Sequence, residues 1–314
     1  MLREKILSGQ GGVKLYGFTP PKAGNSSDKN FETAARQTER INTLGADGIV
    51  LYDLQEEPGR VDVPRPFPFL PTVEPLSYAR EFLSGVKIPK IIYRCVAKDT
   101  EADFERWTQR LVDPGFEDLA IFVGAATGRR PGEPERLNVK NACRIAATTA
   151  PALCFGGVAI AERHLSKGDE DKRLFEKNTD GCGFFISQTV YDVKASKSLI
   201  ADYAARFAEA GKKAPLLVMS FSPCGSAKTL DFMKWLGVRF SSELESDLKS
   251  SSSILDRSIR ICTEIAQELS AFARERGVPV GMNVESVSIR KEEIDASCSL
   301  FHELADGPFS NAGF

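Results

Sequence analysis

The sequence contains little histidine, no long apolar run and no excess of positive charge. Its two histidines, His164 and His302, exclude a metal centre built from several imidazoles. No apolar stretch approaches the ~18 residues of a transmembrane helix, and the start MLREKILSGQGG does not resemble a signal peptide. A formal charge of −2 argues against nucleic-acid or anionic membrane surfaces, because both need a basic excess. We therefore expect no metal, no nucleic-acid partner and no membrane partner.

The seven cysteines also lack the spacing of a metal or redox site. They are scattered from Cys95 to Cys298, and neither C-x-x-C nor a Cys/His zinc pattern occurs. An odd number of well-separated cysteines is typical of reduced structural thiols. We expect a cytoplasmic protein.

Apolar runs alternate with helix-like segments along the whole chain. Eight runs predict strands: VKLYGFT, DGIVLYD, KIIYRCVA, DLAIFVGAA, ALCFGGVAI, GCGFFISQ, APLLVMSFS and VPVGMNVESV. Most are continuously apolar, which is typical of parallel strands buried on both faces. The longest predicted helix runs from Ile254 to Arg276, and the serine run Lys249 to Ser253 is expected to be a flexible loop with a helix cap at its end. Eight strand–helix units predict an α/β protein, a (β/α)8 TIM barrel, with residues 1–314 as a single domain.

In such a barrel the functional residues gather at the carboxyl ends of the strands. Polar residues at the predicted ends are Thr19, Tyr52, Asp53, Arg94, Glu162, His164, Gln188, Ser220, Ser222, Asn283 and Glu285. The loop after the second strand, LQEEPGRVDVPRPFPF, adds acids, arginines and phenylalanines. Loops longer than about 12 residues without structure of their own are functional or disordered, and the apolar content favours function. The alternative interpretation is a solvated loop whose phenylalanines fasten it to the barrel.

Three segments resemble the methylenetetrahydrofolate reductase family, a (β/α)8 barrel that carries FAD. YGFTPP (16–21) is similar to the end of that family's first strand, and AERH (161–164) to its Pro-Glu-x-His. EDKRLFEKNTDGCGFFISQTVYD (170–192) is similar to a segment with an acid, a lysine, a glutamine and several aromatic residues. The resemblance implies reduction of 5,10-methylenetetrahydrofolate to 5-methyltetrahydrofolate with NAD(P)H, FAD as a cofactor and a homo-oligomer.

The resemblance also implies roles for individual residues. Gln188 matches the glutamine that contacts the pterin, whose amide both donates and accepts hydrogen bonds. Lys177 and Glu170 match residues that hold the FAD diphosphate and ribityl region. Together with the strand ends, this predicts folate-binding residues Gln188, Tyr52, Asp53, Phe67, Glu162 and Asn283, and cofactor-binding residues Lys177, Glu170, Arg94 and His164. Structural interpretations remain open: Gln188 bonded to backbone, Lys177 and Glu170 as an exposed pair, and His164 as a packed side chain.

Three departures from the family pattern concern catalysis. Gly17 stands where the family has a glutamate that acts as general acid, a role typically worth about 10²–10⁴-fold in rate. The family's Arg-Gly-Asp turn is replaced by VGAATGRRPG (123–132), and IIYRC replaces Pro-His-Leu-Thr in the third strand. We predict that Glu57 or Glu56 supplies the acid.

Three hypotheses for function follow. The first is a reductase of methylenetetrahydrofolate that uses NAD(P)H, with or without bound FAD, and the sequence favours it. The second is a non-redox binder of (methyl)tetrahydrofolate that serves a methyltransferase partner. The third is a barrel with unrelated chemistry, because a fold does not fix a function.

Overall fold

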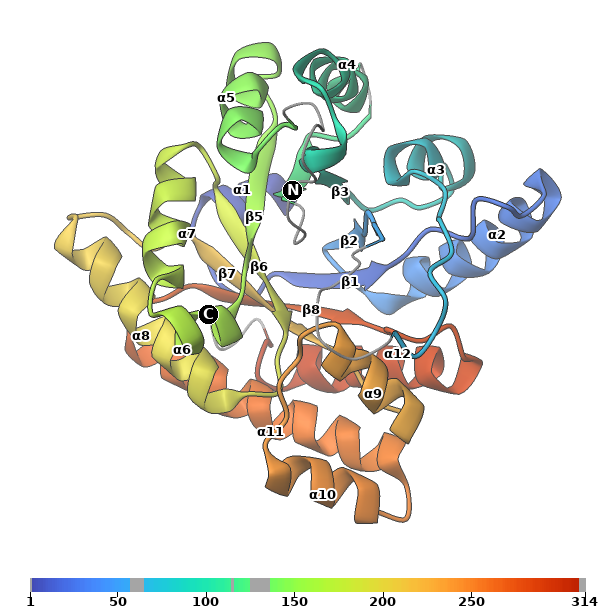
Figure 1. Cartoon of the computed structure of the whole chain (residues 1–314), viewed down its shortest axis with the longest axis vertical. Coiled ribbons are helices and arrows are strands. Elements are labelled where there is room, and N and C mark those ends of the chain that lie inside the picture. Colours follow the sequence, from blue (N-terminus) through green and yellow to red (C-terminus); the bar gives the residue numbers. More distant parts are fainter. Residues whose placement is uncertain (1, 57–64, 114–115, 125–135, 311–314) are drawn as a thin grey trace.

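The computed structural model describes residues 2–56, 65–113, 116–124 and 136–310. Eight parallel strands form a closed barrel in sequence order, each paired with the next and β8 paired with β1 (Figure 1). The strands are β1 Lys14–Phe18, β2 Gly48–Leu51, β3 Lys90–Cys95, β4 Leu119–Val123, β5 Cys154–Ala159, β6 Phe184–Thr189, β7 Leu216–Phe221 and β8 Val280–Glu285. The predicted (β/α)8 barrel is confirmed.

Helices surround this barrel as an outer layer, except that the first short helix of the chain lies across its amino end (Figure 1). They are α1 Leu2–Leu7, α2 Ser27–Leu44, α3 Pro75–Phe82, α4 Glu101–Val112, α5 Val139–Thr149, α6 Ala161–Lys167, α7 Glu170–Thr179, α8 Val193–Glu209, α9 Ala227–Trp235, α10 Ser242–Ser250, α11 Ile254–Glu275 and α12 Lys291–Asp306, with a 3₁₀ turn at Val96–Lys98. Within the described ranges, no helix has the length and apolarity needed to cross a membrane.

Two expectations about the connections need correction. The serine run Lys249–Ser253 is only partly a loop, because α10 extends to Ser250. The expected cap at its end is confirmed, since the Ser253 hydroxyl accepts a hydrogen bond from the Asp256 amide at the start of α11. Ala161 to His164 do not form the end of a strand or a loop. They lie in α6, which begins directly after β5 because nothing in AERH disfavours a helix.

Successive strand residues point alternately into the barrel and toward the helices. The interior cluster contains Leu15, Val50, Ile91, Ile121, Phe184 and Val218, whereas Ile49, Ile92, Phe122 and Phe185 pack in the outer cluster. Leu2 and Ile6 of α1 belong to the interior cluster and pack against residues at the amino ends of the strands. The amino end of the barrel is therefore filled by apolar side chains, and the polar interior residues lie toward the carboxyl end.

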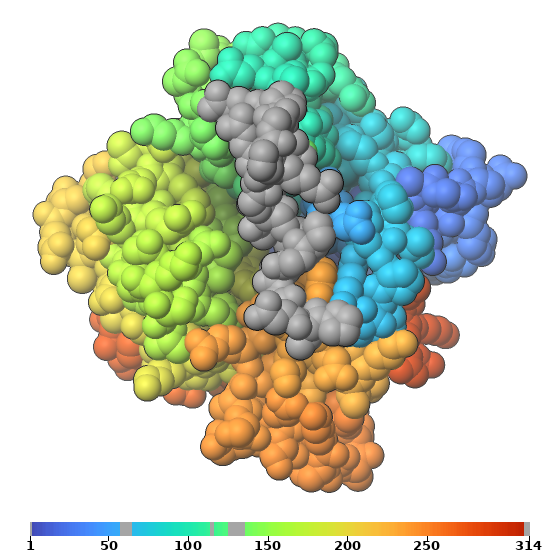
Figure 2. All heavy atoms as spheres, viewed as in Figure 1, coloured from blue at the N-terminus to red at the C-terminus, as the bar shows by residue number. Residues whose placement is uncertain are grey.

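The all-atom view shows the helical layer around this arrangement (Figure 2). Helices α2, in blue, and α3, in cyan, lie on one side, α5 to α7, in green to yellow-green, on the other, and α9 and α10, in orange, along a third. The loops after the strands, together with the last interior residues of each strand, form the mouth of the barrel.

Candidate functional site

Gly17 and Glu285 occupy paired positions on neighbouring strands. The register of β1 with β8 places Gly17 opposite Glu285, and that of β1 with β2 places it opposite Val50. A Cβ atom at Gly17 would lie 2.7 Å from Tyr52 Oη and 3.1 Å from Asn283 Oδ1. The tyrosine therefore occupies the space into which a side chain at position 17 would project.

Tyr52 connects the groups around this position. Its ring packs edge-on against Tyr93, with centroids 4.9 Å apart, and its hydroxyl accepts a hydrogen bond of 2.8 Å from Asn283 Nδ2. Burial raises the pKa values of Tyr52 and Tyr93 well above the ordinary tyrosine value. Both phenols are therefore neutral at physiological pH, and the Tyr52 hydroxyl remains able to donate to Glu285.

Glu285 is a half-buried carboxyl at the carboxyl end of β8. Its Oε1 accepts a hydrogen bond of 2.8 Å from Thr189 Oγ1 on β6. Burial raises the pKa of Glu285, while hydrogen bonds from Tyr52 and Thr189 act in the opposite direction. A carboxyl in this situation can accept hydrogen bonds when ionised and donate one when protonated, which is typical of groups that contact a polar ligand.

Asn283 carries a buried acceptor without a partner. The residue is fully buried, and its Nδ2 donates to Tyr52 Oη and, at 3.2 Å, to Ser220 Oγ. Its Oδ1 has no hydrogen-bond partner within the part of the chain that the structure describes. Because a buried carbonyl oxygen without a donor is destabilising, an N–H group of a ligand in the mouth would satisfy it.

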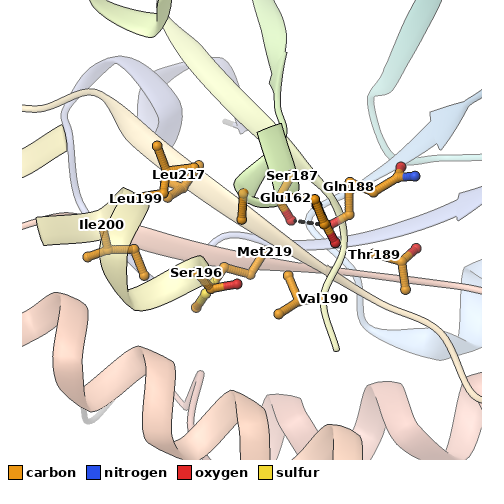
Figure 3. Close-up of a pocket in the computed structure, with 11 residues that line it drawn as sticks. Glu162, Ser187, Gln188, Thr189, Val190, Ser196, Leu199, Ile200, Leu217 and Met219 are labelled. Atoms are coloured by element: carbon orange, nitrogen blue, oxygen red, sulfur yellow. Dashed lines mark hydrogen bonds between the residues drawn. The ribbon is translucent and has the colours of Figure 1, made fainter. Parts of the chain in front are cut away.

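Gln188 lies at the end of β6 and reaches toward the far end of α9. Its Nε2 donates a hydrogen bond of 2.7 Å to the carbonyl oxygen of Leu236. In Figure 3 its side chain extends away from Leu199 and Ile200 of α8. Its amide oxygen accepts no hydrogen bond from the described residues, so the oxygen remains available to a ligand in the mouth.

A small cavity lies on the outer side of β6 and β7, between these strands and helices α6 and α8 (Figure 3). It has a volume of about 20 Å³ and is lined by residues of α6, β6, β7 and α8, including Glu162 and Ser187. This volume holds about one water molecule and cannot take a pterin ring. Burial raises the pKa of Glu162. The structure thus places this predicted folate-binding residue at a water-sized cavity on α6, and its role remains a prediction.

Asp53 and Arg94 form ion pairs within the protein. Asp53 Oδ2 accepts hydrogen bonds from the Cys95 amide at 2.8 Å and from Lys98 Nζ at 2.6 Å. Arg94 donates two hydrogen bonds to Asp99, at 2.7 and 2.6 Å, and one to Glu74 at 3.2 Å. These ion pairs connect the carboxyl ends of β2 and β3 to the turn that follows β3. Asp53, predicted to bind folate, and Arg94, predicted to bind the cofactor, thus have their charges paired within the protein.

Lys177, Glu170 and His164 lie among α6, α7 and α8. Lys177 Nζ donates to the carbonyl oxygen of Val158 at 2.7 Å, and burial lowers its pKa. Glu170, fully buried, accepts from Arg163 at 3.0 Å, and His164 Nε2 lies 2.9 Å from Asp202 Oδ2. With Arg94 also paired, these four residues fit the diphosphate of FAD poorly, and their assignment to a cofactor remains untested.

The structure describes only part of the loop that was predicted to carry the catalytic acid and the aromatic residues. Glu57 lies outside the described residues, and Glu56 is exposed. Phe67 is at the rim of the mouth, where its ring contacts Phe232 of α9 edge-on at 5.4 Å between centroids. The surrogate role of Glu57 or Glu56 is thus still a prediction.

Sequence reasoning included Glu285 among the strand ends but did not select it as the acid. The signal was present: GMNVE alternates, so Gly281, Asn283 and Glu285 share one face. In a closed barrel β8 is adjacent to β1, so that face adjoins Gly17.

Comparisons with known proteins identify a relative of this chain among the solved structures. No family model and no curated protein matches this chain. A protein from Clostridium thermocellum that binds two copies of 5-methyl-5,6,7,8-tetrahydrofolic acid is 40% identical, with 96% of this chain and 97% of that chain covered and a TM-score of 0.83.

Two other structures match less well. A psychrophilic glycoside hydrolase family 10 endo-beta-1,4-xylanase is 10% identical (93% of this chain, 96% of that chain, TM-score 0.49). The 7,8-dihydropteroate synthase from Vibrio fischeri ES114 is 12% identical (93% and 91%, TM-score 0.43). Similarities this weak support no argument about function.

Proposed function

Since this chain belongs to the same family as the clostridial protein that binds 5-methyltetrahydrofolate, we propose that it binds a reduced folate in the mouth of its barrel. The single observation that carries the proposal is 40% identity over nearly the full length of both chains. The polar groups around Gly17 supply a site whose chemistry suits such a ligand.

The pterin ring of a reduced folate is flat, with N–H donors and acceptors along its edge. The unpartnered Asn283 Oδ1 and the Glu285 carboxyl offer acceptors for those N–H groups. Tyr52 and Tyr93 offer aromatic surface against which a ring can pack. Gln188 adds an amide oxygen at the end of β6. Hydrogen-bond acceptors and aromatic rings therefore lie together near the carboxyl ends of β1, β2, β6 and β8.

We favour a binding role over reduction of the folate. Gly17 has no proton to give, and Arg94, Lys177 and Glu170 use their charges in internal contacts. The relative is described as a binder of the methyl form, which is the product of the reduction implied by the resemblance to methylenetetrahydrofolate reductase. A protein of this kind would hold methyltetrahydrofolate for a methyltransferase partner, and NAD(P)H and FAD have less support.

Titration calorimetry with 5-methyltetrahydrofolate tests the proposal. We expect saturable binding that Asn283→Ala weakens about tenfold or more, because the ligand loses an acceptor in a buried site. Asn42→Ala is the control, because Asn42 is also hydrogen-bonded through its side-chain amide, to the Gly85 carbonyl and the Lys87 amide, but lies on α2 away from the mouth. Absence of binding by the wild type, or equal effects of the two substitutions, would refute the proposed site.

A second assay separates binding from reduction. NADH or NADPH is supplied with 5,10-methylenetetrahydrofolate, with and without FAD, and nucleotide oxidation is followed. We expect no oxidation above the protein-free rate. Oxidation that depends on the protein and is lost in Glu285→Gln would instead identify a reductase with Glu285 as its acid.

A further inference from the structure

Six residues at the rim of the mouth form a cluster of cations and aromatic rings. This rim cluster consists of Arg65, Phe67 and Phe69 from the segment after β2, and Lys228, Phe232 and Trp235 from α9. The Arg65 guanidinium lies 4.8 Å from the centroid of Trp235 and 5.2 Å from that of Phe69. Lys228 Nζ lies 4.5 Å from the centroid of Phe67. Cations of this kind are attracted to aromatic faces.

The topology places the rim cluster on the same side of the mouth as Gly17 and Glu285. Helix α9 follows β7, and β8 and β1 stand between β7 and β2 in the barrel. The segment that leads into α3 pairs with the segment after β1, through a bridge between Lys22 and Thr72. Its earlier part, residues 65–69, then reaches α9. Figure 2 shows the blue and orange atoms of these two segments side by side.

Gln188 connects this rim to the polar groups inside the mouth. Its amide donates to the carbonyl oxygen of Leu236, the residue after Trp235. The end of α9 is thereby held against the end of β6. A ligand that contacts Glu285 with one end can therefore extend along the rim cluster with the other.

The rim cluster has the chemistry of a site for an aromatic carboxylate. Phe67 is 36% exposed, although it is a large apolar residue. Lys228 is exposed, and no ion pair among the described residues includes it. A ligand that combines an aromatic ring with several carboxylates would cover the Phe67 ring and neutralise the Lys228 ammonium.

We propose that the rim cluster binds the p-aminobenzoyl-glutamate portion of the folate, and that it selects folates with more than one glutamate. This inference rests on the proposed function for the location of the pterin ring. Each added glutamate brings another carboxylate to the rim, so affinity increases with tail length. The preference decreases with added salt, because exposed charge pairs are screened.

The test compares the mono- and triglutamate forms of 5-methyltetrahydrofolate by calorimetry. We expect the wild type to bind the triglutamate more tightly, and Lys228→Gln to reduce that preference about threefold. Phe67→Ala is expected to weaken both forms, because the ring contact is common to them. Lys212→Gln is the matched control, because Lys212 is exposed and lies 5.2 Å from the Phe175 ring but in the loop before β7, at the opposite end of the barrel.

Several outcomes would overturn the tail site. Equal affinity for the mono- and triglutamate forms would do so. Equal effects of Lys228→Gln and Lys212→Gln would also do so, because the rim cluster would then only hold the segment after β2 against α9. If the wild type binds two ligands, as the clostridial protein does, a fall to one in Phe67→Ala would assign the rim to a second pterin ring.

Failure of the tail site can be distinguished from failure of folate binding. p-Aminobenzoyl-triglutamate, which lacks the pterin, serves as a separate probe. If the tail site exists, the probe binds the wild type and binds Lys228→Gln more weakly, whatever the result with 5-methyltetrahydrofolate. No binding of the probe, together with tight binding of both folates, would overturn the tail site and leave the pterin site intact.

Discussion

Gly17 and Glu285 pair in register across β1 and β8, so a carboxyl lies directly beside a position that has no side chain. The space at Gly17 is taken by the Tyr52 ring. The acid that the resemblance places on the first strand is thus absent, and a different acid is present on the neighbouring strand. This relationship makes Glu285 the first residue to test.

Glu285→Gln should weaken binding of 5-methyltetrahydrofolate about 10- to 100-fold, because hydrogen bonds to a charged group contribute more than neutral ones. The substitution keeps the shape of the side chain and its contact with Thr189. Calorimetry measures the effect, with Glu292→Gln on the exposed surface of α12 as the control. Unchanged affinity would mean that Glu285 does not contact the ligand.

The same substitution should stabilise the ligand-free protein at high pH. Burial raises the pKa of Glu285, so the folded state holds the proton more tightly than the unfolded state. The associated stability is fully present below the ordinary glutamate pKa and is lost as pH rises through the raised value. Gln cannot ionise, so the gain in Tm over wild type should be larger at pH 8 than at pH 4. Thermal unfolding at the two pH values checks this, and equal gains would contradict it.

Gly17→Ala should lower folate affinity about tenfold, because the added methyl would displace the Tyr52 ring or the Asn283 amide. Gly24→Ala provides the control, since a Cβ there meets no atom within 4 Å and the backbone is not left-handed. Both variants are compared by calorimetry and by urea unfolding. Similar affinities for the two variants would show that the fit around Gly17 is not required.

Gln188→Ala should weaken folate binding by more than it weakens the fold. The substitution removes the amide oxygen from the mouth and releases the end of α9, which also lies in the rim cluster. We expect about a tenfold loss of affinity, against about 1 kcal/mol of stability for one hydrogen bond. Gln267→Ala on the exposed face of α11 is the control. A loss of stability without a loss of affinity would leave Gln188 with a purely structural role.

Asp53→Asn should act mainly on stability. The side chain of Asp53 is 4% exposed, and it loses its ion pair with Lys98 while an acceptor for the Cys95 amide remains. Breaking a buried ion pair costs about 3–5 kcal/mol, and the partial exposure of Lys98 should bring the loss to the lower end of that range. Urea unfolding measures the loss. A large fall in folate affinity with unchanged stability would restore Asp53 as a ligand-binding residue.

The barrel could be predicted because its strands are short, apolar runs separated by helical segments. When eight such runs alternate with helical segments, few folds other than an α/β barrel fit the pattern. The helix at Ala161–His164 was not predicted, because four residues after a strand carry too little periodicity to separate a helix from a loop.

The site was harder to predict because a polar residue at a strand end can either bind a ligand or pair with another residue of the protein. Asp53 and Arg94 look like ligand-binding residues in the sequence, yet Lys98 and Asp99, which pair with them, lie in and just after the turn that follows β3. Only the folded chain shows that these charges meet. Glu285 is the converse case, since its neighbour Gly17 is nearly the whole chain away in sequence.

Helix α1 has a consequence for how a ligand would be transferred. Leu2 and Ile6 close one end of the barrel, so a ligand held among Tyr52, Asn283 and Glu285 enters and leaves through the other end. A methyltransferase that receives the ligand directly would have to cover that same opening. Complex formation and exchange with free ligand would then compete, and release into solution would stop while the two proteins remain together.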